Sequence, residues 1–201
     1  MRIPAVLILL FFVSVPSMAG VRLSGGADIS SAYLWRGERV CGLHLYPELA
    51  LTTGNFTFMA YGYFPFDGLY AERDIEASYR IRNVSLHTAC YFVYMSHEET
   101  QLMEAALCWT PSRLPFRLRW FTFFHGDDSS YCDAELYHGF GRFGTLTGNC
   151  GVSVGKGIVH CEVRYSVGFR VGPLDLPVSC AYMLNPYLGD RFVNISAGLR
   201  F

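Results

Sequence analysis

The sequence has little charge and no excess of either sign. Charged residues make up 16 % of the chain, and 16 Lys and Arg stand against 17 Asp and Glu, for a formal net charge of −1. Proteins that bind nucleic acid usually carry a basic excess. We therefore expect no nucleic-acid partner.

A second long hydrophobic run is also missing. The apolar run from Ala5 to Val15 precedes Ser17-Met18-Ala19, which has small residues where signal peptidase reads the chain. We expect residues 1–19 to be a secretory signal peptide and residues 20–201 to form the mature domain. No later stretch has 18 or more apolar residues, which excludes a membrane-spanning helix there. No cysteine follows the expected cut, which argues against a lipoprotein.

The seven cysteines lack the spacing of metal ligands. No CxxC motif or suitably spaced Cys/His pair is present, and their odd number does not suit a complete disulfide framework. Most alternate with apolar neighbours and are interpreted as small hydrophobic residues. We expect no metal site and no cofactor. Cys41, in a predicted loop, is the exception that could pair with another chain.

What the sequence does have is a period of two. Between Val159 and Val171 every second residue is apolar or Cys, and the residues between them carry all the charges. Successive side chains of an extended strand point to opposite faces, so this pattern predicts a strand with one apolar face. At about 3.3 Å per residue, the strand is long enough to cross a membrane at a tilt.

The same alternation recurs in twelve segments, beginning with Arg22 to Trp35 and Leu43 to Thr53. Turns on one edge recur about every 30 residues, as in an up-and-down barrel. We expect an all-β fold: a closed antiparallel up-and-down transmembrane β-barrel of about 12 strands. Pro47 cannot donate to a ladder, and ten strands would follow if its hairpin lay outside the wall.

Alternation alone does not separate a barrel from a soluble sandwich, whose apolar faces would pack against each other. Aromatic residues at the strand ends favour the barrel, because they occupy the places of an interfacial girdle. A bilayer also requires closure, since open strand edges would leave backbone groups unpaired in hydrocarbon. These aromatic residues include Tyr33, Trp35, Phe64, Tyr70, Tyr94, Trp109, Phe124, Tyr131, Phe169 and Tyr187.

The C-terminal segment Asn194-Ile195-Ser196-Ala197-Gly198-Leu199-Arg200-Phe201 resembles the last strand of bacterial outer-membrane proteins. In that class, a terminal Phe after alternating apolar residues is similar to the signal read by the barrel-assembly machinery. The resemblance implies the bacterial outer membrane as the location. It also implies outer-membrane lipid and the assembly machinery as partners, with Phe201 as the assembly signal.

A second resemblance lies near the other end. Ser31-Ala32-Tyr33-Leu34-Trp35-Arg36-Gly37, followed by Pro47-Glu48-Leu49 and Gly54-Asn55-Phe56, is similar to the N-terminal region of the TorF-like porin family. Those exported barrels carry a Ser-x-Tyr-x-aromatic-Arg-Gly segment early in the mature chain. The resemblance implies an exported porin-type barrel and names no substrate.

In such a barrel the polar strand faces line the lumen. Neighbouring strands lie about 4.8 Å apart, so Arg117 and Arg119 should reach Glu104, Asp133 and Glu135. The predicted lumen-lining residues are Asp28, Glu48, Glu72, Asp74, Glu76, Arg80, Glu104, Arg117, Arg119, Asp133, Glu135, Glu162, Arg164, Arg170 and Arg200.

Two interpretations of this wall stay open. It lines a small porin-like channel for passive diffusion of small polar solutes, or it is a neutralised network that fills a narrow structural barrel. The bulky residues Phe121 and Phe123 also face inward. No predicted connection exceeds about ten residues, so we expect any selectivity to come from the wall and not from an inward-folded loop.

A lipid-modifying barrel enzyme is the third interpretation. The loop His125-Gly126-Asp127-Asp128-Ser129-Ser130 has the residue types of a Ser/His nucleophile system. Its spacing resembles no barrel phospholipase, palmitoyltransferase or deacylase motif, so a solvated acidic loop is favoured. We predict no catalytic residues, a channel function, and both termini on the periplasmic side.

Overall fold

The computed structural model describes residues 20–68, 70–95 and 98–201, so the predicted signal peptide lies outside the described residues. The chain there is almost entirely β-structure. Its elements are β1 (Val21–Ser30), β2 (Tyr33–Trp35), β3 (Glu38–Cys41), β4 (His44–Thr53), β5 (Phe56–Pro65), β6 (Tyr70–Ile81), β7 (Val84–Met95), β8 (Glu98–Trp109), β9 (Phe116–His125), β10 (Ser130–Gly139), η1 (Gly141–Phe143), β11 (Thr145–Ser153), β12 (Gly157–Val171), β13 (Leu174–Asn185) and β14 (Asp190–Arg200).

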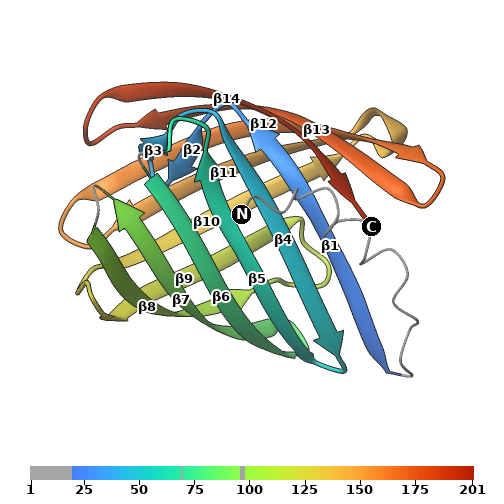
Figure 1. Ribbon diagram of the computed structural model, residues 1–201, viewed down its shortest axis with the longest axis horizontal. Coiled ribbons are helices and arrows are strands. Elements are labelled where there is room, and N and C mark those ends of the chain that lie inside the picture. Colours follow the sequence, from blue (N-terminus) through green and yellow to red (C-terminus); the bar gives the residue numbers. More distant parts are fainter. Residues whose placement is uncertain (1–19, 69, 96–97) are drawn as a thin grey trace, which may run out of the picture.

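β1 and β4 to β14 form one closed antiparallel barrel, in which each strand pairs with its neighbours along the chain (Figure 1). The barrel closes where β1 pairs with β14, with Gly26 opposite Arg200. The predicted fold class and the number of 12 strands are therefore confirmed. Pro47 lies within β4, opposite Ala27 of β1, so the ten-strand alternative is wrong.

Glycines allow a close approach at the closing seam. The Phe201 amide donates to the Gly25 carbonyl over 3.0 Å, and the Gly25 amide donates to the Phe201 carbonyl over 3.2 Å. A Cβ atom on Gly26 would overlap the Leu199 carbonyl and the Arg200 side chain. The final strand is thus seated against two glycines, while the role of Phe201 as an assembly signal stays a prediction.

The outer face of the barrel is apolar and open to the surroundings. Ile75, Trp120 and Val163 have exposed fractions of 56 %, 60 % and 55 %. A sandwich would bury such side chains between two sheets, so the sandwich alternative is wrong. No helix in the described ranges is long and apolar enough to span a membrane.

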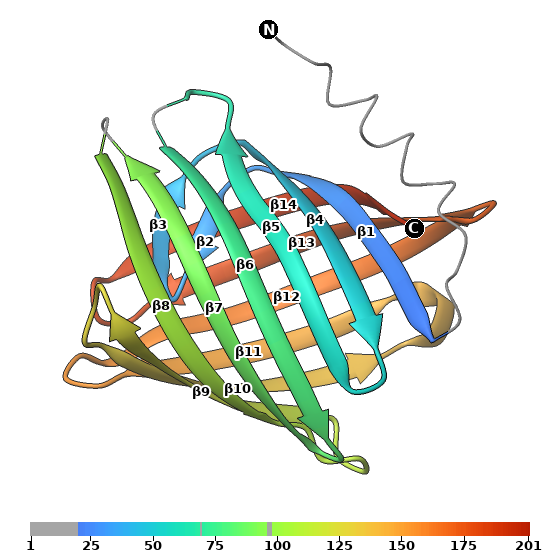
Figure 2. The same cartoon turned by 60° about the horizontal axis from the view of Figure 1, so that its bottom comes forward.

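The first connection differs from the prediction. The first strand ends at Ser30 and not at Trp35, and residues 31–43 contain the short β2–β3 hairpin. In Figure 2, β2 and β3 lie behind the front strands and within the outline of the barrel. The connection is therefore longer than about ten residues and folds inward, contrary to the expectation from loop length.

Two register shifts interrupt the wall within the described strands. One lies between Met103 and Glu104, where β8 pairs with β9, and the other between Gly151 and Val152, where β11 pairs with β12. The second shift leaves Val159 as an extra residue in β12, with an exposed fraction of 4 %. The prediction that Val159 lies on the outer face is wrong, because one extra residue reverses the alternation.

The expected aromatic girdle is only partly present. Trp109, Phe124, Phe169 and Tyr187 are exposed, whereas four of the other aromatic residues that we assigned to it turn inward or lie in the hairpin. These are Tyr33, Trp35, Tyr70 and Tyr131. The seven cysteines have free thiols, and Cys41 lies in β3 and not in an open loop.

Candidate functional site

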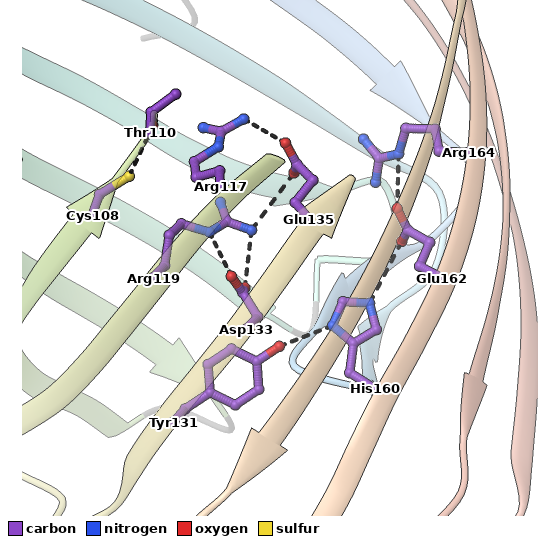
Figure 3. A network of polar contacts seen from close by, with 10 residues as sticks. All are labelled: Cys108, Thr110, Arg117, Arg119, Tyr131, Asp133, Glu135, His160, Glu162 and Arg164. Atoms are coloured by element: carbon purple, nitrogen blue, oxygen red, sulfur yellow. Dashed lines mark hydrogen bonds and ion pairs between the residues drawn. The ribbon is translucent and has the colours of Figure 1, made fainter. Parts of the chain in front are cut away.

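The barrel wall carries ion pairs between neighbouring strands (Figure 3). Arg119 of β9 donates to both carboxylate oxygens of Asp133 of β10, at 2.8 and 2.9 Å, and Arg117 donates to Glu135 at 2.5 Å. The pairs form because these residues stand directly opposite each other in the register of β9 and β10. Glu104, which we expected within reach of these arginines, has a different partner.

The network continues along β12. Tyr131 of β10 and His160 of β12 share a hydrogen bond of 3.0 Å between the hydroxyl and Nδ1. On the same face of β12, Arg164 donates to Glu162 at 2.9 Å. Across the closing seam, Arg200 contacts further acidic residues on β1 and β4. Its partners are Asp28 at 2.5 Å and Glu48 at 2.9 Å.

The remaining predicted residues are placed less uniformly. Glu76 pairs with His87 at 2.7 Å. Arg170 pairs with Asp175 beside the β12–β13 turn, where its side chain is 76 % exposed, and Arg80 is exposed beside the β6–β7 turn. These two arginines lie at one mouth of the barrel and away from its centre.

The hairpin base packs on β5 and β6. The Tyr33 hydroxyl donates to Glu72 over 3.3 Å, and the Tyr33 ring stacks on Tyr63 with a centroid distance of 3.7 Å. Glu72 and Asp74 are both buried in this region. On the opposite side, Asn194 of β14 accepts hydrogen bonds from the Ser30 hydroxyl and the Ala32 amide. The base is thereby tied to both sides of the barrel.

The hairpin tip reaches β8. Arg36 donates to Glu104 at 2.5 Å, and the side chains of this pair are 14 % and 2 % exposed. The Arg36 Cζ atom lies 4.6 to 5.1 Å from the centroids of four aromatic rings, within the range of cation–π contacts. We call the residues that surround this guanidinium the Arg36 seat. They are Glu104, Phe121, Phe123 and Tyr131 of the wall, and Trp35 of the hairpin.

The tip is also fixed through its backbone. Asn185 of β13 donates its Nδ2 to the Gly37 carbonyl over 3.1 Å. A Cβ atom on Gly37 would overlap the carbonyl of Val159. Glu104 and Val159, the wall residues against which the tip rests, lie at the two register shifts, and bulges of this kind re-aim side chains next to functional sites.

The turn at the tip holds Arg36 in an unfavourable backbone conformation. Arg36 has φ 48° and Gly37 has φ 91°, so both central residues of this two-residue turn have positive φ. This matches the type I′ turn that suits the twist of a hairpin. For a residue with a Cβ atom the left-handed conformation costs about 1–2 kcal/mol. The contacts in the seat offset this cost.

Cavities lie on both sides of the tip. The first, of about 590 Å³, is lined by Trp35 and Arg36 together with residues of the β9–β10 and β11–β12 connections. The second, of about 330 Å³, is lined by inward residues of β5 to β9, including Glu104 and Phe121. Arg36 borders the first cavity and Glu104 the second, so the ion pair lies between them.

The acidic loop at residues 126–129 is organised around Asp127. Its carboxylate accepts hydrogen bonds from the Asp128 amide and from the amide and hydroxyl of Ser129. Burial opposes ionisation of Asp127, but these bonds outweigh it and hold the pKa of this carboxyl below its usual value. Ser129 is therefore engaged by its own loop. In the described part of the chain, no group of three or more His, Cys, Asp and Glu residues is arranged to hold a metal ion.

Sequence reasoning missed that Arg36, Asn185 and Asn194 fix the hairpin: Arg36 and Asn194 stood only within the segments that carry the two resemblances, and Asn185 was given no role. One usable signal was Gly37, since glycine readily adopts the positive φ that the second central residue of a two-residue hairpin turn requires. The turn was not recognised because Tyr33 and Trp35 continue the alternating pattern of the predicted first strand, which made residues 31–35 look like part of that strand.

Comparisons with known proteins identify the barrel but no family. No family model matches the chain, and no curated protein matches it by sequence. The chain is similar to three solved outer-membrane barrels, each matched over nearly its whole length. They are the KdgM porin (TM-score 0.56, 8 % identity, 89 % of this chain and 97 % of that chain), LpxR from Salmonella typhimurium (0.55, 9 %, 89 % and 99 %) and an outer membrane channel from Pseudomonas putida F1 (0.53, 10 %, 93 % and 96 %).

At such low identity the likeness shows the fold alone, because one barrel architecture serves many unrelated functions. The resemblance to the TorF-like porin family is not tested by these matches and stays a prediction.

Proposed function

We propose that this protein is a porin-like channel of the bacterial outer membrane. It passes small polar solutes by passive diffusion, and the β2–β3 hairpin narrows its lumen. The observation that carries this proposal is the closed barrel with an exposed apolar exterior and two cavities, each lined by charged as well as apolar residues, with the Arg36–Glu104 pair between them. Such an exterior suits hydrocarbon, and such an interior suits water.

The hairpin, more than the wall, is expected to set which solutes pass. Arg117 and Arg119 are neutralised by Asp133 and Glu135 on the next strand. A neutralised wall exerts little net attraction on a passing ion. The hairpin, by contrast, places the bulk of Arg36 and its partner Glu104 between the two cavities, so it acts by obstruction and not by net charge.

The rival proposals receive less support. A lipid-modifying enzyme needs a positioned nucleophile and base, and the Ser129 hydroxyl donates to Asp127 at 2.9 Å. A purely structural barrel would suit the ion-pair network, but the cavities on both sides of the tip favour a conduit that the hairpin obstructs.

Planar-bilayer recording tests the proposal. The chain from Gly20 onward is refolded in detergent and compared with a variant in which residues 33–41 are replaced by a short Gly-Ser linker. We expect conductance from both proteins, roughly threefold larger for the variant because the obstruction is gone. Replacing residues 126–129 by a linker is the matched control. If none of the three proteins conducts, the structural barrel is favoured.

The proposed location and partners are supported by the predicted signal peptide at residues 1–19 and by the C-terminal strand that ends at Phe201. We infer export through residues 1–19, periplasmic termini, insertion by the barrel-assembly machinery and contact with outer-membrane lipid. Deleting Phe201 should lower the amount of folded barrel in the outer-membrane fraction, because the closing strand loses its last ladder pair with Gly25. An unchanged amount would remove Phe201 as the assembly signal.

A further inference from the structure

The Arg36 seat has the chemistry of a cation-binding site. Its wall part offers one buried carboxylate, Glu104, and three aromatic rings, those of Phe121, Phe123 and Tyr131. Aromatic faces attract cations through their quadrupole, and a planar guanidinium can stack on them while donating to a carboxylate. This combination favours a guanidinium over a compact, strongly hydrated ion.

The wall part of the seat does not depend on the hairpin. Glu104 lies on β8, Phe121 and Phe123 on β9, and Tyr131 on β10, three consecutive strands of the barrel. The pairing of these strands holds the side chains together. Arg36 is therefore an insertion into a site that the wall already provides.

Arg36 is held in the seat as a tethered cation. Its backbone has the left-handed conformation, with φ 48°, which a residue with a Cβ atom rarely adopts. The pair that it forms with Glu104 separates the two cavities. A cationic solute that enters the first cavity therefore meets a site of matching chemistry, already filled by the chain itself.

We propose that Glu104, Phe121, Phe123 and Tyr131 form a binding site for guanidinium-bearing solutes, and that Arg36 occupies it as a built-in competitor. A solute passes by taking the place of the Arg36 side chain. This inference rests on the proposed channel for its role in transport, but binding at the site can be measured without any conduction.

Isothermal titration calorimetry in detergent tests the site with methylguanidinium chloride. We expect saturable binding to Arg36→Ala that is at least about tenfold tighter than to the unmodified chain, because the competitor is gone. Arg36→Ala combined with Glu104→Gln should weaken this binding about tenfold, since a charge-assisted hydrogen bond is lost. Methylammonium should bind more weakly, because it lacks the planar guanidinium group.

Arg39→Ala is the matched control. Arg39 belongs to the same hairpin, is exposed, and contacts the Cys41 carbonyl and no residue of the wall part of the seat. Its removal should not create a binding site. Arg36→Gln, which keeps a side chain of intermediate length, replaces Arg36→Ala if that variant does not refold, as judged by heat-dependent mobility on a gel.

The outcomes separate the two proposals. Equal binding to the unmodified chain, the Arg36 variant and Arg39→Ala, or binding indifferent to Glu104→Gln, overturns the site. Conductance without such binding overturns the site and leaves the channel. Binding without conductance from any variant overturns the channel and leaves the site. Concentration-dependent block of the Arg36 variant by methylguanidinium, about tenfold weaker after Glu104→Gln, supports both.

Discussion

Two ion pairs of the lumen differ in how the chain brings them together. Arg119 and Asp133 stand opposite each other on adjacent strands, so their contact follows from the ladder. Arg36 and Glu104 belong to an inward-folded hairpin and to a strand that does not pair with it. The first contact is part of the wall, and the second is a docking contact that can break while the wall stays closed.

The difference extends to burial. The Arg119 and Asp133 side chains are 28 % and 5 % exposed, so the arginine of the wall pair can turn toward water, whereas the Arg36 and Glu104 side chains are 14 % and 2 % exposed. A buried charge that loses its partner is far more costly than a partly solvated one. Breaking the docking pair should therefore release the hairpin, and breaking a wall pair should mainly change the local charge.

Glu104→Gln should have the largest effect. Arg36 would lose its counter-ion, and the loss of docking free energy should approach about 3 kcal/mol. We expect the hairpin to undock and trypsin to cleave after Arg36 or Arg39 much faster than in the unmodified barrel. Glu135→Gln is the control, since its partner Arg117 is 38 % exposed and can turn toward water, and Arg119 keeps Asp133. Equal cleavage rates in the two variants would show that the hairpin is not held by this pair.

Gly37→Ala should have the next largest effect. A Cβ atom would overlap the Val159 carbonyl, and the residue has φ 91°, so docking should weaken by about 1–2 kcal/mol. Gly54→Ala is matched, because Gly54 also has positive φ but has open space around its Cβ position. Tryptic cleavage after Arg39 should be faster in Gly37→Ala. If Gly54→Ala has the same effect, the contact with β12 is not responsible.

The double variant Arg117→Ala with Arg119→Ala should change the ion selectivity of the channel and leave the docking of the hairpin largely unaffected. Asp133 and Glu135 would lose their partners, which leaves negative charge on the wall. We expect the cation-to-anion permeability ratio to rise about twofold, measured as a reversal potential in a salt gradient. Arg170→Ala, at the mouth, should leave the ratio unchanged. A doubled ratio in that variant would assign selectivity to the mouth.

Arg164→Ala should have the smallest effect. The Arg164 side chain is 44 % exposed, and its pair with Glu162 joins two residues of one strand. An exposed pair of this kind contributes about 0.5 kcal/mol or less. Urea unfolding in lipid vesicles should therefore match the unmodified barrel within error. A loss comparable to that of Gly37→Ala would contradict the distinction between wall pairs and docking contacts.

Much of the wall could be predicted from the sequence, because alternation and hairpin spacing are local properties. The contacts of Arg117 and Arg119 with Asp133 and Glu135 could be predicted, because these residues lie on neighbouring strands and face the same side of the sheet. Val159 escaped prediction, because the bulge in β12 depends on how β11 and β12 register and leaves no mark on the alternating pattern. Glu104, Phe121 and Phe123 were expected to face the lumen, but their common contact with Arg36 escaped prediction, because β8 and β9 lie far along the chain from the hairpin.

The amino-acid pattern was sufficient for a closed barrel with an apolar exterior and a charged interior, since a period of two has few other solutions in a bilayer. It was not sufficient for what fills that interior. The inward fold of residues 31–43 depends on contacts with Glu72, Glu104, Asn185 and Asn194, which lie on four different strands. These residues become neighbours only when the barrel closes, so their common role appears only in the folded molecule.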